Sequence, residues 1–219
     1  MQKEKVIATA VEKRRFQAES GIRSFACSGD GNLLAVASYD FQKKMGKIEI
    51  WETDSEKRKW SISLTGEPRR IALSADGKTL IAGVTNEINA KGFAAREGEI
   101  QAIAVQTGKE LFAFRVSSPA PVIAFHPKGD LFAVDYGSSS PFAVRRTIQF
   151  RNAKGKIVKE FETPIFSFQL AFSKDGSFIA VAGLSKKVEV VKVKTAEPHF
   201  TVTVADKPYS ICFSPDSKS

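Results

Sequence analysis

Cysteine and histidine are scarce in this chain of 219 residues, which contains two of each. Neither Cys27 nor Cys212 has a second cysteine or a histidine at the short spacing of a zinc site, and two cysteines cannot build a disulfide scaffold. No stretch approaches the roughly 18 apolar residues of a membrane-spanning helix, and residues 1–16 lack the apolar core of a signal peptide. These absences predict a soluble cytoplasmic protein with reduced thiols and no membrane contact.

Helical periodicity of useful length is also missing, and the charge is unbalanced. Lysine and arginine number 33 against 24 acidic residues, which gives a formal net charge of +9. Hydrophobic residues make up 42% and charged residues 26% of the chain, as expected for a globular protein rather than a disordered one. The length is enough for one or two hydrophobic cores.

One block of sequence occurs five times along the chain. Each copy is a short apolar strand that runs into a polar turn, most often Ser-x-Asp-Gly. Asp-Gly between apolar runs is a strong hairpin signal. The copies are FACSGDG at 25–31, IALSADG at 71–77, IAFHPKG at 123–129, LAFSKDG at 170–176 and ICFSPDS at 211–217.

Further strands follow each block. A second apolar strand comes at once, as at 33–37, and a third strand with alternating character comes later, as at 48–51. A fourth stretch completes a four-stranded antiparallel meander, and such small units become stable by stacking radially as propeller blades. The sequence therefore predicts an all-β propeller. Its blades are expected at 22–64, 68–116, 120–163 and 167–204, with partial blade strands at 6–18 and 209–219.

The order of these elements resembles the WD-repeat β-propellers, particularly the divergent prokaryotic-type repeats. The resemblance runs from about Ile22 to Ser219, and it is carried by the Ser-x-Asp-Gly turns, the Leu-Ala-Val-Ala strand at 34–37 and the Ile-x-Ile-Trp strand at 48–51. It implies a non-catalytic scaffold that binds a protein or peptide and holds no cofactor.

The chain departs from the family pattern in two places. The Trp-Asp pair that names the family is Trp51-Glu52 here, and the later repeats have neither residue of it. The Gly-His pair of typical repeats is absent as well. We therefore do not expect the polar network that those residues form in the family. The replacements in the later repeats are Gln106-Thr107, Arg151-Asn152 and Val191-Lys192.

Two other functions stay open at this point. A propeller enzyme, lactonase-like or quinoprotein-like, collects its catalytic groups from separate blades and leaves no local motif. Residues 104–112 loosely resemble a quinoprotein repeat but lack its Asp and Trp. The propeller can also be an accessory domain of a longer multidomain protein. Because the sequence has no nucleophile elbow, phosphate loop or metal-spaced His and Glu, we expect a protein that is not an enzyme.

The two ends of the chain each predict an incomplete blade. Residues 6–18 match the third and fourth strands of a unit, and 209–213 match the first strand of another whose turn reaches the last residue. A five-bladed ring with a three-stranded closing blade explains this pattern, and so does a truncated piece of a larger propeller. The stop within a turn favours truncation.

The recurrent acids and the rare residues invite a catalytic interpretation that the repeat explains more simply. Four of the five repeats have Asp at the same turn position, where it is favoured because its side chain bonds the local backbone. His126 stands where other repeats have serine, and His199 has no partner motif, so neither is expected to be a ligand. Cys27 takes a slot that is apolar elsewhere and is predicted as a small core residue. The turn acids are Asp30, Asp76, Asp175 and Asp216, and Cys212 takes a slot that is alanine in the other repeats.

The connections between second and third strands are the candidate binding surface. They are long in the first three units, at 38–47, 84–102 and 135–147. By the meander topology they emerge on one face, which Arg69 and Arg70 also reach. Aromatic and basic residues together are typical of interface anchors. The candidate partner-binding residues are Phe41, Lys43, Lys44, Lys91, Phe93, Arg96, Tyr136, Phe142, Arg145 and Arg146, with Tyr39 beside them.

The alternative interpretation is that these loops are solvated insertions whose phenylalanines fold back over the blade edges. If the face binds, its charge favours an acidic or phosphorylated peptide. A nucleic-acid backbone is less favoured, because acidic residues dilute the charge of the same loops. Those acids are Asp40, Glu87, Glu97 and Glu99.

Overall fold

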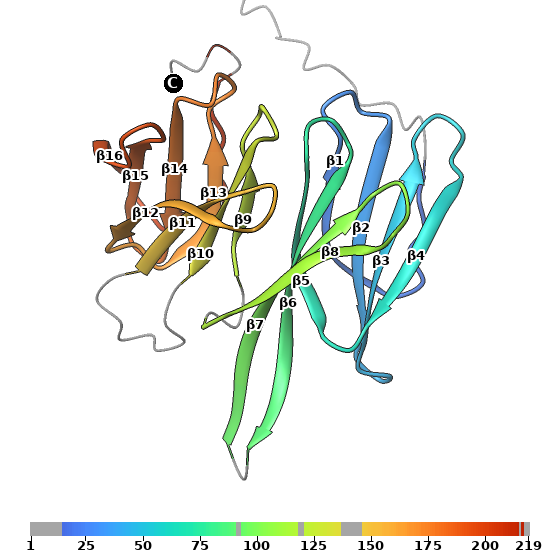
Figure 1. Cartoon of the computed structure of the whole chain (residues 1–219). Helices are drawn as coiled ribbons and strands as arrows, with labels where there is room; N and C mark the ends of the chain where they lie inside the picture. The colour runs from blue at the N-terminus through green and yellow to red at the C-terminus, as the bar shows by residue number, and fades with distance from the viewer. Residues whose placement is uncertain (1–14, 91–92, 118–120, 137–145, 215, 217–219) are drawn as a thin grey trace, which may run out of the picture.

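The computed structural model describes residues 15–90, 93–117, 121–136, 146–214 and 216, and the regular elements within them are all β-strands (Figure 1). They form four antiparallel sheets of four strands. The first sheet contains β1 (Gly21–Cys27), β2 (Leu33–Asp40), β3 (Met45–Glu52) and β4 (Arg58–Leu64). The second contains β5 (Glu67–Leu73), β6 (Thr79–Ala90), β7 (Phe93–Ala104) and β8 (Glu110–Val116).

The remaining two sheets repeat this plan. The third contains β9 (Ile123–Phe125), β10 (Leu131–Tyr136), β11 (Arg146–Asn152) and β12 (Ile157–Thr163). The fourth contains β13 (Ser167–Phe172), β14 (Phe178–Gly183), β15 (Lys187–Lys192) and β16 (Pro198–Thr203). In every sheet, strands that follow one another in the chain are hydrogen-bonded neighbours. The predicted four-stranded antiparallel meanders are confirmed.

The Ser-x-Asp-Gly turns are held by a local hydrogen-bond network. In the first sheet the Ser28 hydroxyl donates to Asp30 Oδ1 over 2.5 Å, and the same oxygen accepts the Asn32 backbone N–H over 3.0 Å. Ser28 Oγ in turn accepts the Leu33 N–H, which starts β2. Gly31 has a φ of 75°, a conformation that glycine adopts without strain. The repeated aspartates are therefore turn residues.

The third turn replaces this serine with His126, which links two sheets. His126 is buried, its Nδ1 lies 2.8 Å from Asp130 Oδ1, and its Nε2 lies 3.1 Å from the carbonyl oxygen of Gly176. Gly176 belongs to the turn between β13 and β14 and has a φ of 76°. The ring thus connects the third sheet to the fourth at the turns.

Three hydrophobic clusters join consecutive sheets. One lies between the first and second sheets, one between the second and third, and one between the third and fourth. Strand β6 shows how alternation allows this packing: Leu80 and Ala82 face the first sheet, and Ile81 faces the third. The innermost strands β1, β5, β9 and β13 are neighbours along the same row. The inner edges of all four sheets therefore meet around a common space.

The second sheet differs from its prediction. Residues 84–102 were expected as a long loop, but β6 and β7 extend through this range as one ladder that ends with Ala90 opposite Phe93. The hairpin projects well past the other strands in Figure 1. The loop interpretation is wrong because backbone hydrogen bonds between the two strands sustain the ladder without an apolar alternation in the sequence.

Cys27 is exposed on the outer face of the first sheet. In the other sheets the residue at this slot, such as Leu73, packs on the preceding sheet. No further sheet lies on this face of the first sheet within the part of the chain that the structure describes, and Cys27 is exposed instead of buried. The predicted core role is therefore wrong. Cys212 is exposed too, and residues 209–214 form no strand.

Candidate binding site

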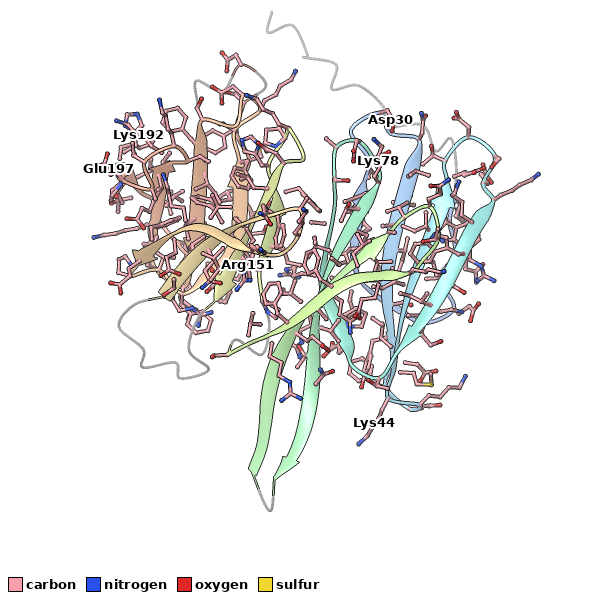
Figure 2. The ribbon with its side chains drawn as sticks, in the orientation of Figure 1. Asp30, Lys44, Lys78, Arg151, Lys192 and Glu197 are labelled. Atoms are coloured by element: carbon pink, nitrogen blue, oxygen red, sulfur yellow. The ribbon has the colours of Figure 1, made fainter. Side chains whose placement is uncertain are left out.

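A pocket lies at the end of the sheets where second strands connect to third strands, here called the loop end. Figure 2 shows Lys44 at this end, and Asp30 and Lys78 at the opposite end, which carries the Ser-x-Asp-Gly turns. The pocket has a volume of about 150 Å³ and joins the first sheet to the second. This loop pocket is lined by Arg23, Tyr39, Phe41, Lys44, Glu67, Arg69 and Thr85.

The connection between β2 and β3 is a tight turn that fixes the position of Lys44. Asp40 Oδ1 accepts the backbone N–H groups of Gln42 over 2.9 Å and of Lys43 over 3.0 Å. The N–H of Lys43, followed by that of Gln42, lowers the pKa of the Asp40 carboxyl. Lys44 has a φ of 52°, the left-handed conformation that lets the chain return into β3. The carboxylate of Asp40 thus holds the turn through its backbone.

Phe41 forms the aromatic wall of the pocket. Its side chain is 66% exposed, and the Arg23 guanidinium carbon lies 4.6 Å from its ring centroid. Tyr39 packs edge-on against the same ring, with centroids 5.1 Å apart. A guanidinium over an aromatic face is attractive because the ring carries negative charge density on its faces. The contact positions Arg23, and Phe41 still presents apolar surface to solvent.

Glu67 holds two arginines beside this wall. Its Oε1 lies 2.8 Å from Arg23 Nη2, and its Oε2 lies 3.0 Å from Arg69 Nε and 2.9 Å from Arg69 Nη2. Lys44 forms no ion pair with the residues described. The pocket therefore carries three cationic side chains and one carboxylate, and its net charge is positive.

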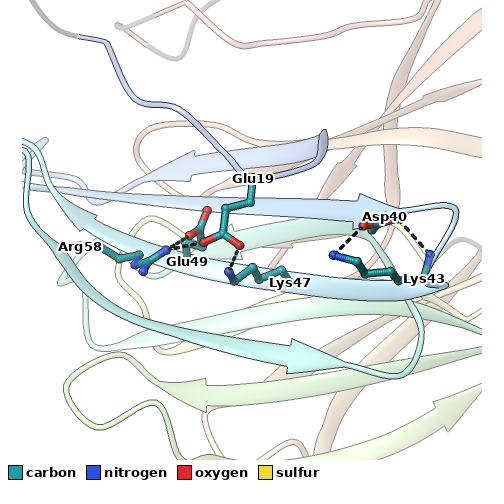
Figure 3. A network of polar contacts seen from close by, with 6 residues as sticks. All are labelled: Glu19, Asp40, Lys43, Lys47, Glu49 and Arg58. Carbon is teal, nitrogen blue, oxygen red and sulfur yellow. Dashed lines mark hydrogen bonds and ion pairs between the residues drawn. The ribbon is translucent and has the colours of Figure 1, made fainter.

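The structure brings Phe41 and Lys44 of the candidate partner-binding residues together here, along with Tyr39 and Arg69, which were expected on the same face. Lys43 lies next to them but does not line the pocket. Its side chain is 76% exposed, and its Nζ lies 3.6 Å from Asp40 Oδ2 (Figure 3). The two adjacent lysines thus differ in surroundings, because only Lys44 faces the arginines.

Most of the other predicted residues lie where the structure gives no side-chain description. Lys91, Phe142 and Arg145 are outside the described residues. Phe93, Arg96 and Tyr136 belong to strands, the first two to β7 and the last to β10, and their side chains are likewise outside. Their part in a binding face stays a prediction.

Arg146 lies inside the molecule, away from the predicted surface. Its Nε and Nη2 bond Asp135 Oδ1 and Oδ2 over 3.1 and 2.9 Å, and both side chains are at most 2% exposed. Ser167 also donates to Asp135, and the Arg146 guanidinium lies 4.2 Å from the Phe166 ring centroid. Burial raises the pKa of the Asp135 carboxyl, and Arg146 opposes this shift. This pair lies within the third sheet, its contacts with Ser167 and Phe166 link it to the start of the fourth, and its role is structural.

Sequence reasoning missed Arg23 and Glu67. Arg23 sits within a predicted inner strand, and Glu67 precedes the next one, so neither belongs to a long connection. The signal that the sequence offers is Arg23 itself, a charged residue in an otherwise mostly apolar inner strand. In the structure a β-bulge lies at this position, between Ile22 and Ser24. Bulges re-aim side chains, often beside functional sites.

A second polar network lies on the outer face of the first sheet (Figure 3). Arg58 Nη1 lies 2.7 Å from Glu49 Oε1 and 3.0 Å from Glu19 Oε1, while Lys47 Nζ lies 2.6 Å from Glu19 Oε2. The Lys47 and Arg58 hydrogen bonds lower the pKa of the Glu19 carboxyl. The network ties the segment before β1 to the sheet, and Phe16 contacts Trp51 nearby. Every charged group in this network has an oppositely charged partner, although Glu49 Oε2 is buried without a hydrogen bond among the described residues, so the loop pocket is the stronger candidate for an anionic ligand.

Comparison with known families finds a match for one part of the first sheet. Residues 11–42, which include β1, β2 and the start of the turn at Phe41, match the family described as WD domain, G-beta repeat. The matched unit belongs to the first of four sheets with the same strand order. This part of the chain is thus similar to one WD repeat. A search of curated proteins finds no match to the chain.

WD-repeat proteins are generally protein-binding propellers without catalytic activity, and the matched residues of this chain include Arg23, Tyr39 and Phe41 of the loop pocket. Within the described residues no three His, Cys, Asp or Glu side chains are grouped to hold a metal ion. The same residues include no helix with the length and hydropathy needed to cross a membrane.

Proposed function

We propose that this protein is a non-catalytic interaction module that binds an acidic or phosphorylated peptide at the loop pocket. The observation that carries the proposal is the grouping of Arg23, Lys44 and Arg69 around the exposed ring of Phe41, with Glu67 as the one carboxylate among the lining residues. The grouping joins two sheets, so a bound peptide would contact both.

The charge of the pocket favours an anionic partner. Guanidinium groups recognise carboxylates and phosphates through paired N–H donors in a fixed plane. Glu67 orients Arg23 and Arg69 from one side. Each guanidinium has more N–H groups than its contacts with Glu67 use, so N–H donors remain for a ligand. Lys44, without an ion pair among the described residues, adds a third cation whose charge is not offset.

The aromatic wall favours a peptide over a small ion alone. Phe41 presents a large apolar surface, and its ring is already held by Tyr39 and Arg23. The Phe41 side chain therefore loses little conformational freedom when a partner covers it. Exposed aromatic rings next to arginine are the residues that most often dominate binding energy at protein interfaces. A nucleic acid is less favoured because Asp40 and Glu67 lie within the same loop end.

Fluorescence anisotropy with labelled peptides tests the proposal. The probes are hexapeptides of acidic, phosphoserine-containing, neutral and basic sequence, and we expect the acidic or phosphorylated set to bind and the basic set not to bind. Adding salt should weaken the binding, since exposed charges are screened.

The adjacent lysines supply a matched pair of variants. Lys44→Gln should weaken binding about fivefold, as expected for the loss of roughly 1 kcal/mol of charge interaction. Lys43→Gln, which removes the same charge next to the pocket, should change the affinity less than about twofold. Equal losses in both variants would show that net charge alone attracts the peptide, and would remove the loop pocket as the site.

A further inference from the structure

The inner strands of the four sheets line a second cavity, which is open to solvent. Its volume is about 490 Å³, and its lining includes residues from β1, β5, β9 and β13. Ile71 and Ile123 supply apolar wall, while the polar groups are those of Arg23, Ser24, Arg70 and Gln169. None of its lining residues, all within the described part of the chain, carries a carboxylate.

The two arginines of this cavity have hydrogen-bonding capacity that the protein leaves unused. Arg70 Nη1 donates to the carbonyl oxygen of Arg69 over 3.2 Å, and the guanidinium has no carboxylate partner among the residues described. The Nε of Arg23 is buried and has no hydrogen-bond partner there, although its Nη2 pairs with Glu67. A buried cationic donor without an acceptor is unfavourable, and an anion would relieve it.

The neutral polar groups of the cavity are donors as well. Ser24 Oγ accepts the backbone N–H of Ile71 over 3.2 Å, which leaves its own hydroxyl proton to be donated. The side-chain amide of Gln169 makes no hydrogen bond with the described residues and offers two N–H groups. Four donor groups from three strands therefore line one cavity that supplies few acceptors.

The backbone explains why these side chains meet. Each of the three inner strands that contribute donors has a β-bulge at the same position of its repeat, between Ile22 and Ser24, Pro68 and Arg70, and Ser167 and Gln169. The residues that follow the bulges are Ser24, Arg70 and Gln169, and all of them line the cavity. A bulge re-aims the side chains beside it and is typical of functional sites. The repeat thus places one polar residue per bulged strand at the common space.

We propose that this cavity is an oxyanion site, in which Arg70 is the main anchor for a carboxylate or phosphate group and Arg23, Ser24 and Gln169 donate to its remaining oxygens. The proposal stands apart from peptide binding at the loop pocket, although Arg23 lines both cavities. The oxyanion can come from a free anion or from an acidic side chain of a bound peptide, and one experiment separates these sources.

The test is isothermal titration of the full chain with inorganic phosphate, repeated with acetate. We expect saturable binding of at least one anion, and Arg70→Gln should weaken it about tenfold or more because it removes a charged, paired donor. Arg69→Gln is the matched control, since Arg69 lines the loop pocket and not this cavity. It should leave the affinity for the free anion within about twofold of the original.

A second variant and a second ligand keep the test decisive. Gln169→Met removes a neutral donor of similar size and should weaken anion binding about threefold even if Arg70→Gln unfolds the chain. With the acidic peptide as ligand, weakening by Arg70→Gln assigns a peptide side chain to the cavity, and weakening by Arg69→Gln alone leaves the cavity to a free anion. Failure of both phosphate and acetate to bind, or equal binding by the original chain, Arg70→Gln and Gln169→Met, would overturn the proposal.

Discussion

Replacing Arg146 with methionine tests the buried ion pair that Arg146 and Asp135 form within the third sheet. The change removes the guanidinium that bonds both oxygens of Asp135 and, among the described residues, leaves that buried carboxyl with the Ser167 hydroxyl as its one side-chain donor. Breaking a buried pair by removing one partner costs about 3–5 kcal/mol, because the remaining charge stays in a low-dielectric surrounding. Arg146→Met should therefore lower the free energy of unfolding by about that amount at pH 7.

The pH dependence of this loss has a definite sign. Burial raises the pKa of the Asp135 carboxyl even with Arg146 present, and without Arg146 nothing of comparable charge opposes that rise. A carboxyl whose pKa is higher in the folded than in the unfolded protein favours folding at low pH, and this contribution is lost as the pH rises through the folded pKa. The cost of Arg146→Met should thus shrink as the pH falls, because the raised pKa lets Asp135 bind its proton above the usual value of 3.8.

Urea unfolding followed by circular dichroism at several pH values between 4 and 8 measures this cost. Lys43→Met serves as the control, because its ion pair with Asp40 is exposed and should be worth less than about 1 kcal/mol at any pH. A loss below about 1 kcal/mol for Arg146→Met at pH 7, or a loss that does not change with pH, would refute the reasoning.

Two further substitutions test how neighbouring sheets are joined, both by urea unfolding. Gly176→Ala would place a new Cβ against His126 Nε2, whereas Gly31→Ala, at nearly the same φ, would place one with nothing within 4 Å. Gly176→Ala should therefore lower the free energy of unfolding by about 1–3 kcal/mol more than Gly31→Ala. Equal losses would mean that the His126 contact is not held firmly. Trp60→Phe removes the indole N–H that donates to the Val105 carbonyl over 2.6 Å between the first and second sheets. It should lower the free energy of unfolding by about 1 kcal/mol. An unchanged urea midpoint would mean that this hydrogen bond does not stabilise the interface.

The strand plan followed from the sequence because its signals are local. The hydrogen bonds of a Ser-x-Asp-Gly turn join residues at most five positions apart, as those from Ser28 to Asp30 and from Leu33 to Ser28 do. The turn therefore needs no distant partner. The apolar runs on either side then predict paired strands. Alternation within a run, as at Leu80 and Ile81, reflects packing on sheets to either side.

The features that sequence reasoning missed depend on residues far apart in the chain. The hairpin of β6 and β7 continues through polar sequence because backbone pairing sustains it, and no side-chain period reveals that. The loop pocket combines Arg23 with Phe41 and Glu67, whose association is set by packing of the first sheet on the second. Arg146 appeared to belong to a surface loop, yet it starts β11 directly opposite the end of β12 and pairs with Asp135 of β10.

Photo-crosslinking tests the loop pocket most directly. Benzoylphenylalanine is introduced at Phe41, and separately at Phe200 of β16, a phenylalanine that is also about half exposed but lies in the fourth sheet. With the acidic peptide bound and irradiated, the account predicts a covalent adduct at position 41 and none at position 200. Adduct formation at position 200 with none at position 41 would contradict the assignment of peptide binding to the loop pocket.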